Sequence, residues 1–312
     1  LATFVAGPFS AAILAEFGAD VIKIEQPGGG DPLRKFGTPS PGGDGYCWLS
    51  EQRNKRSVTL DLRKPAGADI FKRLIEGADV LCENFRPGTL EKWRLGPAVL
   101  KAVNPRLVLL RISGYGQTGP YRDRPGFARI AHAFGGLSYL TGEPGGPPLT
   151  PGSTSLADYI SGLYGALGIM LSLRARDDSG RGQEIDIALY ESIFRVLDEM
   201  APLYAATGFV RPRLGLGTAN VCPHGHFECG DGEWVAIACT SDKMFARLCE
   251  VMGRPELAAP AKWARGARRI AENEAVDAEV AAWTGARSRA EVLAECEAGE
   301  VPCAPVKTIA DI

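Results

Sequence analysis

One carboxylate in an apolar segment has the setting that covalent chemistry requires. Residues 149–173 read LTPGSTSLADYISGLYGALGIMLSL, in which Asp158 is the single acid and no base occurs. A poorly solvated carboxylate is a strong nucleophile, and small neighbours would let a bulky substrate and backbone N–H donors approach it. The simpler interpretation is that Asp158 caps a helix beginning near Tyr159. Taken by themselves, these residues favour the cap.

A cluster of basic residues is a candidate site for phosphate groups. Arg53, Lys55 and Arg56 precede a predicted strand, and Arg34 and Lys35 lie upstream of them. Arginine grips phosphate oxygens as a planar fork, and lysine acts on them as a point charge. A solvated, charged loop explains the same residues equally well, so both interpretations stay open.

Several familiar catalytic and metal sites are not encoded. The sequence contains no GxGxxG after a first strand, no P-loop, no GxSxG elbow and no HExxH. With only three histidines, a Ser-His-Asp hydrolase is disfavoured, and His132 is typical of a core or rim histidine. The other two histidines fall in residues 222–229, whose PHGHFECG pattern indicates a turn entering a hairpin. We therefore predict no metal site.

Composition excludes several classes of partner. A 45% hydrophobic and 23% charged chain of net charge −2 is typical of a globular protein without affinity for nucleic acid or anionic membranes. No stretch of about 20 uninterrupted apolar residues predicts a membrane span. The eight cysteines include no CxxC pair, which indicates reduced thiols and a cytoplasmic location. Both ends begin or stop within a pattern, so we expect terminal segments to be missing.

The elements that position these residues alternate between strand and helix. Strands are predicted at 20–25, 57–62, 79–85 and 106–116, and helices at 8–17, 65–78, within 88–105, at 126–140, at 155–176 and at 185–207. Such alternation predicts βαβ units and a mainly parallel sheet. Beyond irregular residues 208–232, a strand at 233–240 precedes helical patterns to residue 300. We predict an α/β fold: a large Rossmann-like domain at 1–207 carrying Asp158, and a linker with a smaller α+β domain at 208–312.

Two strand ends carry polar and aromatic residues. ENFRPG (83–88) and RISGYGQTGP (111–120) follow predicted parallel strands directly. Open α/β sheets bind ligands at the carboxyl ends of their strands. These two segments are therefore predicted to form the floor of a ligand crevice.

Taken in order, the sequence blocks resemble the family III CoA-transferases, which include formyl-CoA and carnitine-CoA transferases and the related α-methylacyl-CoA racemases. The resemblance covers the whole chain, most densely residues 5–190, and is carried by AGPFSAAILAEFGADVIKIE, GGDPLR, NKRSVTLDL, ADVLCENFRPG, NPRLVLLRISGYGQTGPY and SGRGQEIDIALYES. It implies a longer subunit shaped as an open ring. Two such rings interlock as a homodimer, with each active site between domains of different subunits.

The resemblance implies a role for Asp158 as the nucleophile. Its carboxylate would attack the donor thioester to give an aspartyl anhydride and CoA thiolate, which would then form an aspartyl-CoA thioester. The acceptor acid would reverse these steps, so that no ATP is needed. With the resemblance included, the nucleophile is favoured over the helix cap.

The resemblance also implies which residues contact CoA, taken as a substrate rather than a tightly bound cofactor. Arg53, Lys55 and Arg56 are electrostatic candidates for its phosphates, independent of the resemblance. The positions that match family contacts are Ala6, Arg34, Leu60, Asn84, Phe85, Lys92 and Trp93.

Three departures from the family pattern bear on the reaction. The racemases place a His-Asp-type acid/base motif where this chain has Gly126-Phe127-Ala128, which argues for transfer. Formyl-CoA transferase has Glu at the position of Ala128 and Gln at that of Val5. Its tetraglycine loop has no counterpart within residues 213–225. Both differences argue against oxalate as the acceptor.

The predicted substrates are succinyl-CoA and a C4–C5 dicarboxylate such as malate or citramalate. Residues 126–144 and 151–167 resemble succinyl-CoA-dependent transferases most closely. The remote carboxylate needs cationic or amide donors, and Arg111, Arg129 and His132 are near in sequence. An acyl-CoA epimerase and a non-catalytic CoA-binding protein are the alternatives.

Overall fold

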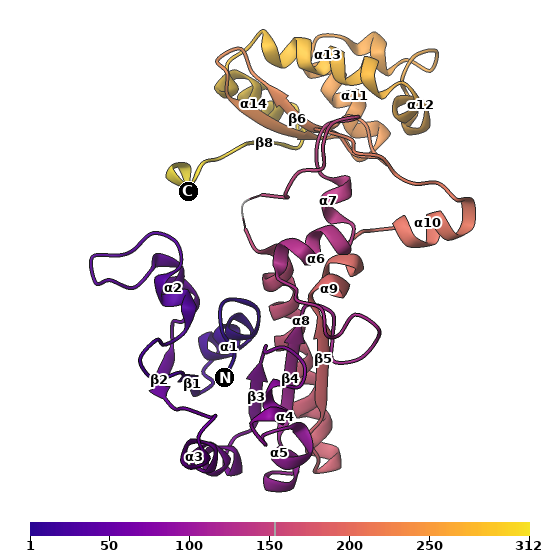
Figure 1. Ribbon diagram of the computed structural model, residues 1–312. Helices are drawn as coiled ribbons and strands as arrows, with labels where there is room; N and C mark the ends of the chain where they lie inside the picture. Colours follow the sequence, from indigo (N-terminus) through magenta and orange to yellow (C-terminus); the bar gives the residue numbers. More distant parts are fainter. Residues whose placement is uncertain (153) are drawn as a thin grey trace. The chain divides into compact units, whose positions relative to one another are not determined.

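The chain folds as two compact units in a computed structural model that describes residues 1–152 and 154–312 (Figure 1). The large unit comprises Leu1–Tyr139 and Leu149–Arg211, and the small unit comprises Leu140–Pro148 and Pro212–Ile312. Residues 140–148 group with the small unit, where the Gly215 N–H donates to the Gly142 carbonyl at 3.1 Å. The sequence placed its domain boundary at 207/208 and did not separate this segment.

Parallel strands organise the large unit, as predicted. β1 (Val21–Glu25) pairs with β2 (Lys55–Thr59), and a separate sheet has the order β3 (Val80–Glu83), β4 (Val108–Ser113), β5 (Glu184–Ala188). The α/β class with parallel strands is therefore confirmed, although the strands form two sheets.

Two strand predictions need correction. β2 begins two residues before the predicted strand and ends three residues before its end. The predicted helix at 185–207 begins instead as β5, whose EIDIA sequence alternates in polarity. Five residues are too few to outweigh the helical patterns around them, and pairing with β4 decides their conformation.

Helices cover the strands of the large unit. The predicted helix at 126–140 is interrupted by Gly135 and Gly136, the latter at a φ of +98° that favours glycine. The helices are α1 (Ala6–Glu16), α2 (Tyr46–Glu51), α3 (Pro65–Glu76), α4 (Thr89–Lys92), α5 (Pro97–Val103), α6 (Ala128–Phe134), α7 (Leu137–Leu140), α8 (Leu156–Ser179), α9 (Leu189–Arg195) and α10 (Met200–Thr207), with a 3₁₀ turn at Pro32–Lys35.

The longest helix, α8, packs closely against α1. The Ser10 hydroxyl donates to the Gly162 carbonyl at 2.9 Å, and a Cβ added to Gly165 would lie 2.5 Å from the Ser10 oxygen. The Phe9 and Tyr159 rings meet edge to face at 4.9 Å. The small residues of the apolar segment are thus needed for this close approach of two helices.

Helix α8 also has the length and apolar composition of a membrane span, with a mean hydropathy of 1.4 in its most apolar window. Core helices share these properties, and α8 packs on α1, β4 and β5. In Figure 1 it runs alongside β4 and β5. We therefore describe it as a core helix of the large unit.

The small unit has its own hydrophobic core. β6 (His224–Glu228), β7 (Trp234–Ala238) and β8 (Cys303–Pro305) form an antiparallel sheet. The sequence anticipated β7 and a hairpin, but residues 224–228, which it assigned to a turn, form the first strand of that hairpin. It missed β8, which is three residues long. The helices are α11 (Asp242–Val251), α12 (Gly266–Ala271), α13 (Asn273–Gly285) and α14 (Arg289–Ala298), with 3₁₀ turns at Pro255–Ala258 and Ile309–Asp311.

Candidate active site

Asp158 lies in the first turn of α8, half-buried and without a cap role. Its carboxylate forms no hydrogen bond or ion pair with any residue that the structure describes, and the N-cap residue Ser155 makes no side-chain cap bond either. Burial raises the pKa of Asp158 to about 7. An unpaired, poorly solvated carboxylate of this basicity is suited to nucleophilic attack. Ser153 of the adjoining LTPGS segment lies outside the described residues.

The amino-terminal end of α1 lies on the same side of α8 as Asp158. Gly162, one helical turn after Asp158, faces α1 so closely that an added Cβ would lie 2.9 Å from the Ala6 carbonyl oxygen. The first-turn N–H groups of Ala6 and Gly7 donate to no acceptor within the described part of the chain. Such free donors stabilise an anion, including the oxyanion formed when a thioester is attacked.

Phe4, which precedes the N-cap residue Val5 of α1, is conformationally strained. Phe4 has a φ of 57°, a left-handed conformation that is costly for a bulky side chain. Its N–H donates to Asp31 Oδ1 at 3.1 Å, and its carbonyl accepts from Gln52 Nε2 at 3.4 Å. These contacts hold the loop that leads into Ala6, and strain of this kind is typical of functional sites.

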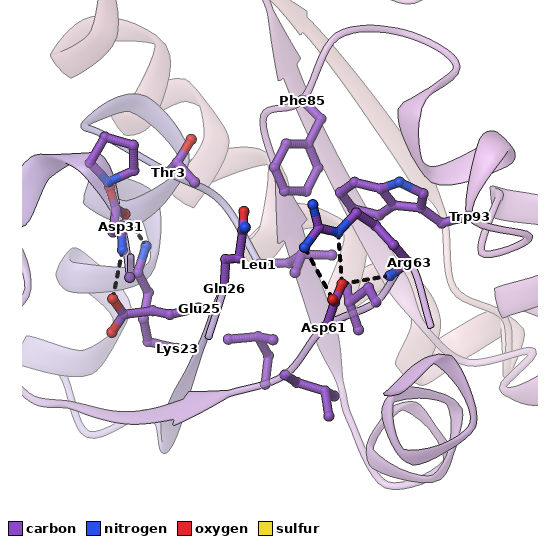
Figure 2. Close-up of a pocket in the computed structure, with 15 residues that line it drawn as sticks. Leu1, Thr3, Lys23, Glu25, Gln26, Asp31, Asp61, Arg63, Phe85 and Trp93 are labelled. Atoms are coloured by element: carbon purple, nitrogen blue, oxygen red, sulfur yellow. Dashed lines mark hydrogen bonds and ion pairs between the residues drawn. The ribbon is translucent and has the colours of Figure 1, made fainter. Parts of the chain in front are cut away.

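A pocket of about 200 Å³ in the large unit gathers three of the predicted CoA-contacting residues. Leu60, Phe85 and Trp93 line it, and the Phe85 and Trp93 rings meet edge to face at 5.2 Å. Figure 2 shows these two rings beside the Arg63 and Asp61 side chains. Apolar walls next to charged groups suit a heteroaromatic ring that carries polar substituents.

The sequence interpretation missed polar residues of this pocket. Gln26, Asp61 and Arg63 line it, and Arg63 Nε donates to Asp61 Oδ1 at 2.8 Å. Asp61 directly follows Leu60 in the LDLR segment, and Arg63 comes two residues later. Their place at the carboxyl end of a parallel strand was the signal that could have found them.

Asn84 and Ala6 lie beside the pocket rather than in its lining. Asn84 Oδ1 accepts from the Thr3 N–H at 2.8 Å, and Asn84 Nδ2 donates to the Thr3 carbonyl at 2.7 Å. Because Thr3 lines the pocket and Ala6 begins α1, Asn84 links the pocket to the amino-terminal end of α1. Lys92 is exposed at the end of α4 and does not line the pocket.

Arg34 is engaged by protein groups next to the pocket. Its guanidinium donates to both oxygens of Glu25 at 2.8 Å and to Asp44 at 2.9 Å, and it stacks 3.8 Å above Trp48. Burial alone would raise the Glu25 pKa, but hydrogen bonds from Arg34 and Ser57 overcome burial and lower it to about 2. Since Glu25 lines the pocket, Arg34 fixes a wall residue.

The other candidate phosphate-binding cations also have protein partners. Arg53 pairs with Glu16 at 2.6 Å, and Arg56 pairs with Asp20. Lys55 is largely enclosed: its ammonium donates to the carbonyls of Pro8 and Glu51, and burial lowers its pKa to about 7. Arg53 and Arg56 are thus exposed cations that pair with acids, whereas Lys55 is enclosed, and a phosphate-binding role for the three stays a prediction.

Two of the three residues that the sequence suggested for binding the remote carboxylate of the acceptor already bind other protein groups. Arg111 is buried and donates to Glu83 at 2.6 Å, while His132 Nε2 accepts from the Ala157 N–H at 3.0 Å. Arg129 is exposed on α6. Among the residues described, no three His, Cys, Asp or Glu side chains gather as a metal site.

Known proteins resemble the chain over its full length. It matches the model of CoA-transferase family III over residues 1–312. It is 59% identical over 311 residues to the succinyl-CoA–L-malate CoA-transferase beta subunit of Chloroflexus aurantiacus, covering 99% of this chain and 77% of the relative. The alpha subunit from the same organism is 54% identical over 310 residues, covering 99% of this chain and 72% of the relative. A CAIB/BAIF family protein from Brucella suis has a crystal structure that matches with a TM-score of 0.87 at 37% identity, covering 100% of this chain and 82% of that one.

Proposed function

Because this chain belongs to CoA-transferase family III and is a CoA-transferase, we propose that it moves CoA from succinyl-CoA to a C4–C5 dicarboxylate such as malate or citramalate. The names of the relatives support these substrates. The observation that carries the mechanism is the unpaired, half-buried Asp158 carboxylate in the first turn of a helix that packs against the amino-terminal end of α1.

In the first half-reaction, an Asp158 oxygen attacks the carbonyl carbon of the donor thioester. The C–S bond breaks, CoA leaves as thiolate, and a mixed anhydride forms on Asp158. The thiolate then attacks the aspartyl carbonyl carbon, releasing the donor acid and leaving an aspartyl-CoA thioester. The acceptor carboxylate repeats the two steps in reverse, so that Asp158 is regenerated and no proton or ATP is consumed.

We propose that backbone groups of α1 stabilise the reaction intermediates and that the pocket residues hold CoA. The Ala6 and Gly7 N–H groups stabilise the oxyanion, and Asn84 fixes the loop that precedes them. Leu60, Phe85 and Trp93 hold the adenine end of CoA, while exposed Lys92 attracts its phosphates. Arg34 contributes indirectly, because its hydrogen bonds hold the pocket residue Glu25 in place.

We further propose that two chains form an interlocked dimer that completes each site. Helix α8 presents a row of exposed apolar side chains, with Leu163, Leu167 and Leu171 each more than half exposed. Such a row is typical of a protein–protein interface. Since the similar malate enzyme has alpha and beta subunits, pairing with a second related chain is the alternative to a homodimer. The cytoplasmic location and the domain boundary at 207/208 stay predictions.

One assay separates transfer from the alternatives. The purified protein is incubated with succinyl-CoA and a panel of dicarboxylic acids, and new CoA esters are identified by mass spectrometry. Transfer predicts a malyl- or citramalyl-CoA product that Asp158→Asn abolishes. Exchange of an α-hydrogen with deuterated solvent, without a new ester, would indicate an epimerase instead, and CoA binding without either reaction would indicate a scaffold.

The covalent step has a separate test. Borohydride or hydroxylamine added during turnover should modify Asp158, located by peptide mass spectrometry. The matched control is Asp178, an exposed acid on the same helix, which should stay unmodified. Continued turnover without modification of Asp158 would contradict the covalent route.

A further inference from the structure

His132 makes an unusual contact with the helix that carries Asp158. It lies on α6, is 1% exposed, and its Nε2 accepts from the Ala157 N–H at 3.0 Å. An accepting nitrogen carries no proton, so the neutral ring holds its proton on Nδ1. Ala157 directly precedes Asp158, so a residue 25 positions away in sequence takes the place of a local helix cap.

This contact leaves a polar group without a partner. His132 Nδ1 is buried, and no described residue accepts its proton. A buried N–H without a partner costs about 1–3 kcal/mol. Burial, and secondarily the positive charge of Arg129, lowers the His132 pKa and so favours the neutral ring that can accept. A residue that serves stability alone would be expected to avoid this cost.

The contact has a consequence for Asp158. The N–H groups in the first turn of a helix are the ones that stabilise a carboxylate there and lower its pKa. Here the Ala157 N–H is taken by His132, and the Asp158 N–H donates to the Ser155 carbonyl at 2.9 Å. Of the neighbouring ionisable groups, the Tyr159 hydroxyl donates to Glu51 Oε1 at 3.0 Å. Arg129, whose charge lowers the His132 pKa, forms no ion pair with Asp158 among the described residues.

We propose that His132 is a positioning residue for Asp158. Its neutral imidazole fixes the first turn of α8 and occupies the Ala157 N–H, so the Asp158 carboxylate gains no backbone hydrogen bond and keeps its nucleophilicity. The nucleophilic role of Asp158 rests on the proposed function, whereas the hydrogen bond from the Ala157 N–H to His132 does not.

The test compares two substitutions of His132 with a control. His132→Leu removes the acceptor, whereas His132→Gln keeps one. Ser161→Ala is the matched control, because Ser161 is a buried residue of the same helix whose hydroxyl also has no partner. The Asp158 pKa is measured by carbon NMR of aspartate-labelled protein, with the signal assigned by Asp158→Asn. The acid limb of kcat against pH is measured for the same variants.

We expect His132→Leu to lower the Asp158 pKa by about one unit or more, to shift the acid limb equally, and to reduce kcat about tenfold with KM for the CoA donor little changed. His132→Gln and Ser161→Ala should keep the pKa of the unsubstituted protein. An unchanged Asp158 pKa in folded His132→Leu would overturn the proposal.

A second measurement covers the case in which His132→Leu does not fold. Nitrogen NMR of the unsubstituted protein should show His132 with Nδ1 protonated and Nε2 unprotonated from about pH 7.5 to 9, and a protonated Nε2 in this range would overturn the proposal. If no aspartyl-CoA forms on the unsubstituted protein, the proposed function fails, while the NMR results still decide the role of His132.

Discussion

At the scale of single residues, Asp158 lowers the stability of the folded chain whenever it is ionised. Its pKa is raised from 3.8 to about 7, so between these values the folded state holds a proton that the unfolded state has lost. The free energy of unfolding therefore falls as pH rises through this window. A nucleophile with no hydrogen-bonding partner thus reduces stability at the pH where it is active.

Asp158→Asn should therefore abolish transfer and stabilise the protein. We expect a gain on the order of 2–4 kcal/mol at pH 8, shrinking toward zero near pH 4, because the amide carries no charge to desolvate. Denaturant unfolding at several pH values checks this. Asp178→Asn, the same substitution at an exposed site of α8, should show no such gain. Equal stability of Asp158→Asn and the unsubstituted protein at pH 8 would contradict the assignment.

Trp93 is the pocket residue with the largest predicted effect on CoA binding. Its ring lines the pocket beside Phe85. Trp93→Ala should raise the Kd of CoA by about tenfold or more, since stacking of a base on an aromatic ring contributes ~1–3 kcal/mol. Titration calorimetry measures this, with Phe194→Ala as a control at an exposed aromatic residue outside the pocket lining. Equal affinities of the two variants for CoA would show that the adenine does not bind against Trp93.

At the scale of elements, the contact between α1 and α8 places the amino-terminal end of α1 against Gly162, one helical turn after Asp158. Glycines make this contact possible, because at Gly162 and Gly165 a methyl group would overlap atoms of α1. The apolar, small-residue composition of residues 149–173 is therefore a packing requirement as well as a chemical one.

Two glycines of α8 give opposite expectations for substitution by alanine. In Gly162→Ala the new Cβ would lie 2.7 Å from Phe9 and 2.9 Å from the Ala6 carbonyl, so α1 must move. We expect a loss of about 1–3 kcal/mol in stability and a larger proportional loss of kcat. In Gly168→Ala the nearest atom is the Cγ2 methyl of Ile185 at 3.2 Å, a small overlap that a slight side-chain shift relieves. Improved helix propensity should therefore leave stability unchanged or raised by up to about 1 kcal/mol. Thermal unfolding and steady-state kinetics of both variants test this, and equal stability losses would contradict it.

At the scale of the whole molecule, the proposed dimer would cover the exposed apolar face of α8 with the second chain. Leu167, Met170 and Leu171 are each more than half exposed on a helix whose other side is packed. Since nearly half of each side chain is already covered, burying the rest in an interface contributes roughly 1–2 kcal/mol each.

Leu167→Glu should weaken or abolish dimer formation. A charge buried without a partner in an apolar interface is strongly unfavourable. Light scattering after size-exclusion chromatography should give twice the chain mass for the unsubstituted protein and for Arg174→Ala, an exposed control on the same helix. The Leu167→Glu variant should give one chain mass. A monomeric unsubstituted protein would instead favour pairing with a second, related chain.

The sequence by itself determined the α/β class, most element positions and the family. These features depend on local periodicity and on ordered blocks, which are visible along the chain. The same information singled out Asp158 and brought Leu60, Phe85 and Trp93 into one candidate set. It did not distinguish β5 from a helix, because only the register with β4 fixes those five residues as a strand.

Only the tertiary structure decided what each polar side chain contacts. Asn84 holds Thr3 from 81 residues away, Arg34 is engaged by Glu25 rather than left free, and His132 reaches the backbone in front of Asp158. Hydrogen bonds extend about 3 Å and depend on direction, so their partners follow from folded geometry and not from residue type or spacing. The role of Asp158 could therefore be predicted from the sequence. The groups that surround it could be identified only from the folded structure, in which distant segments come into contact.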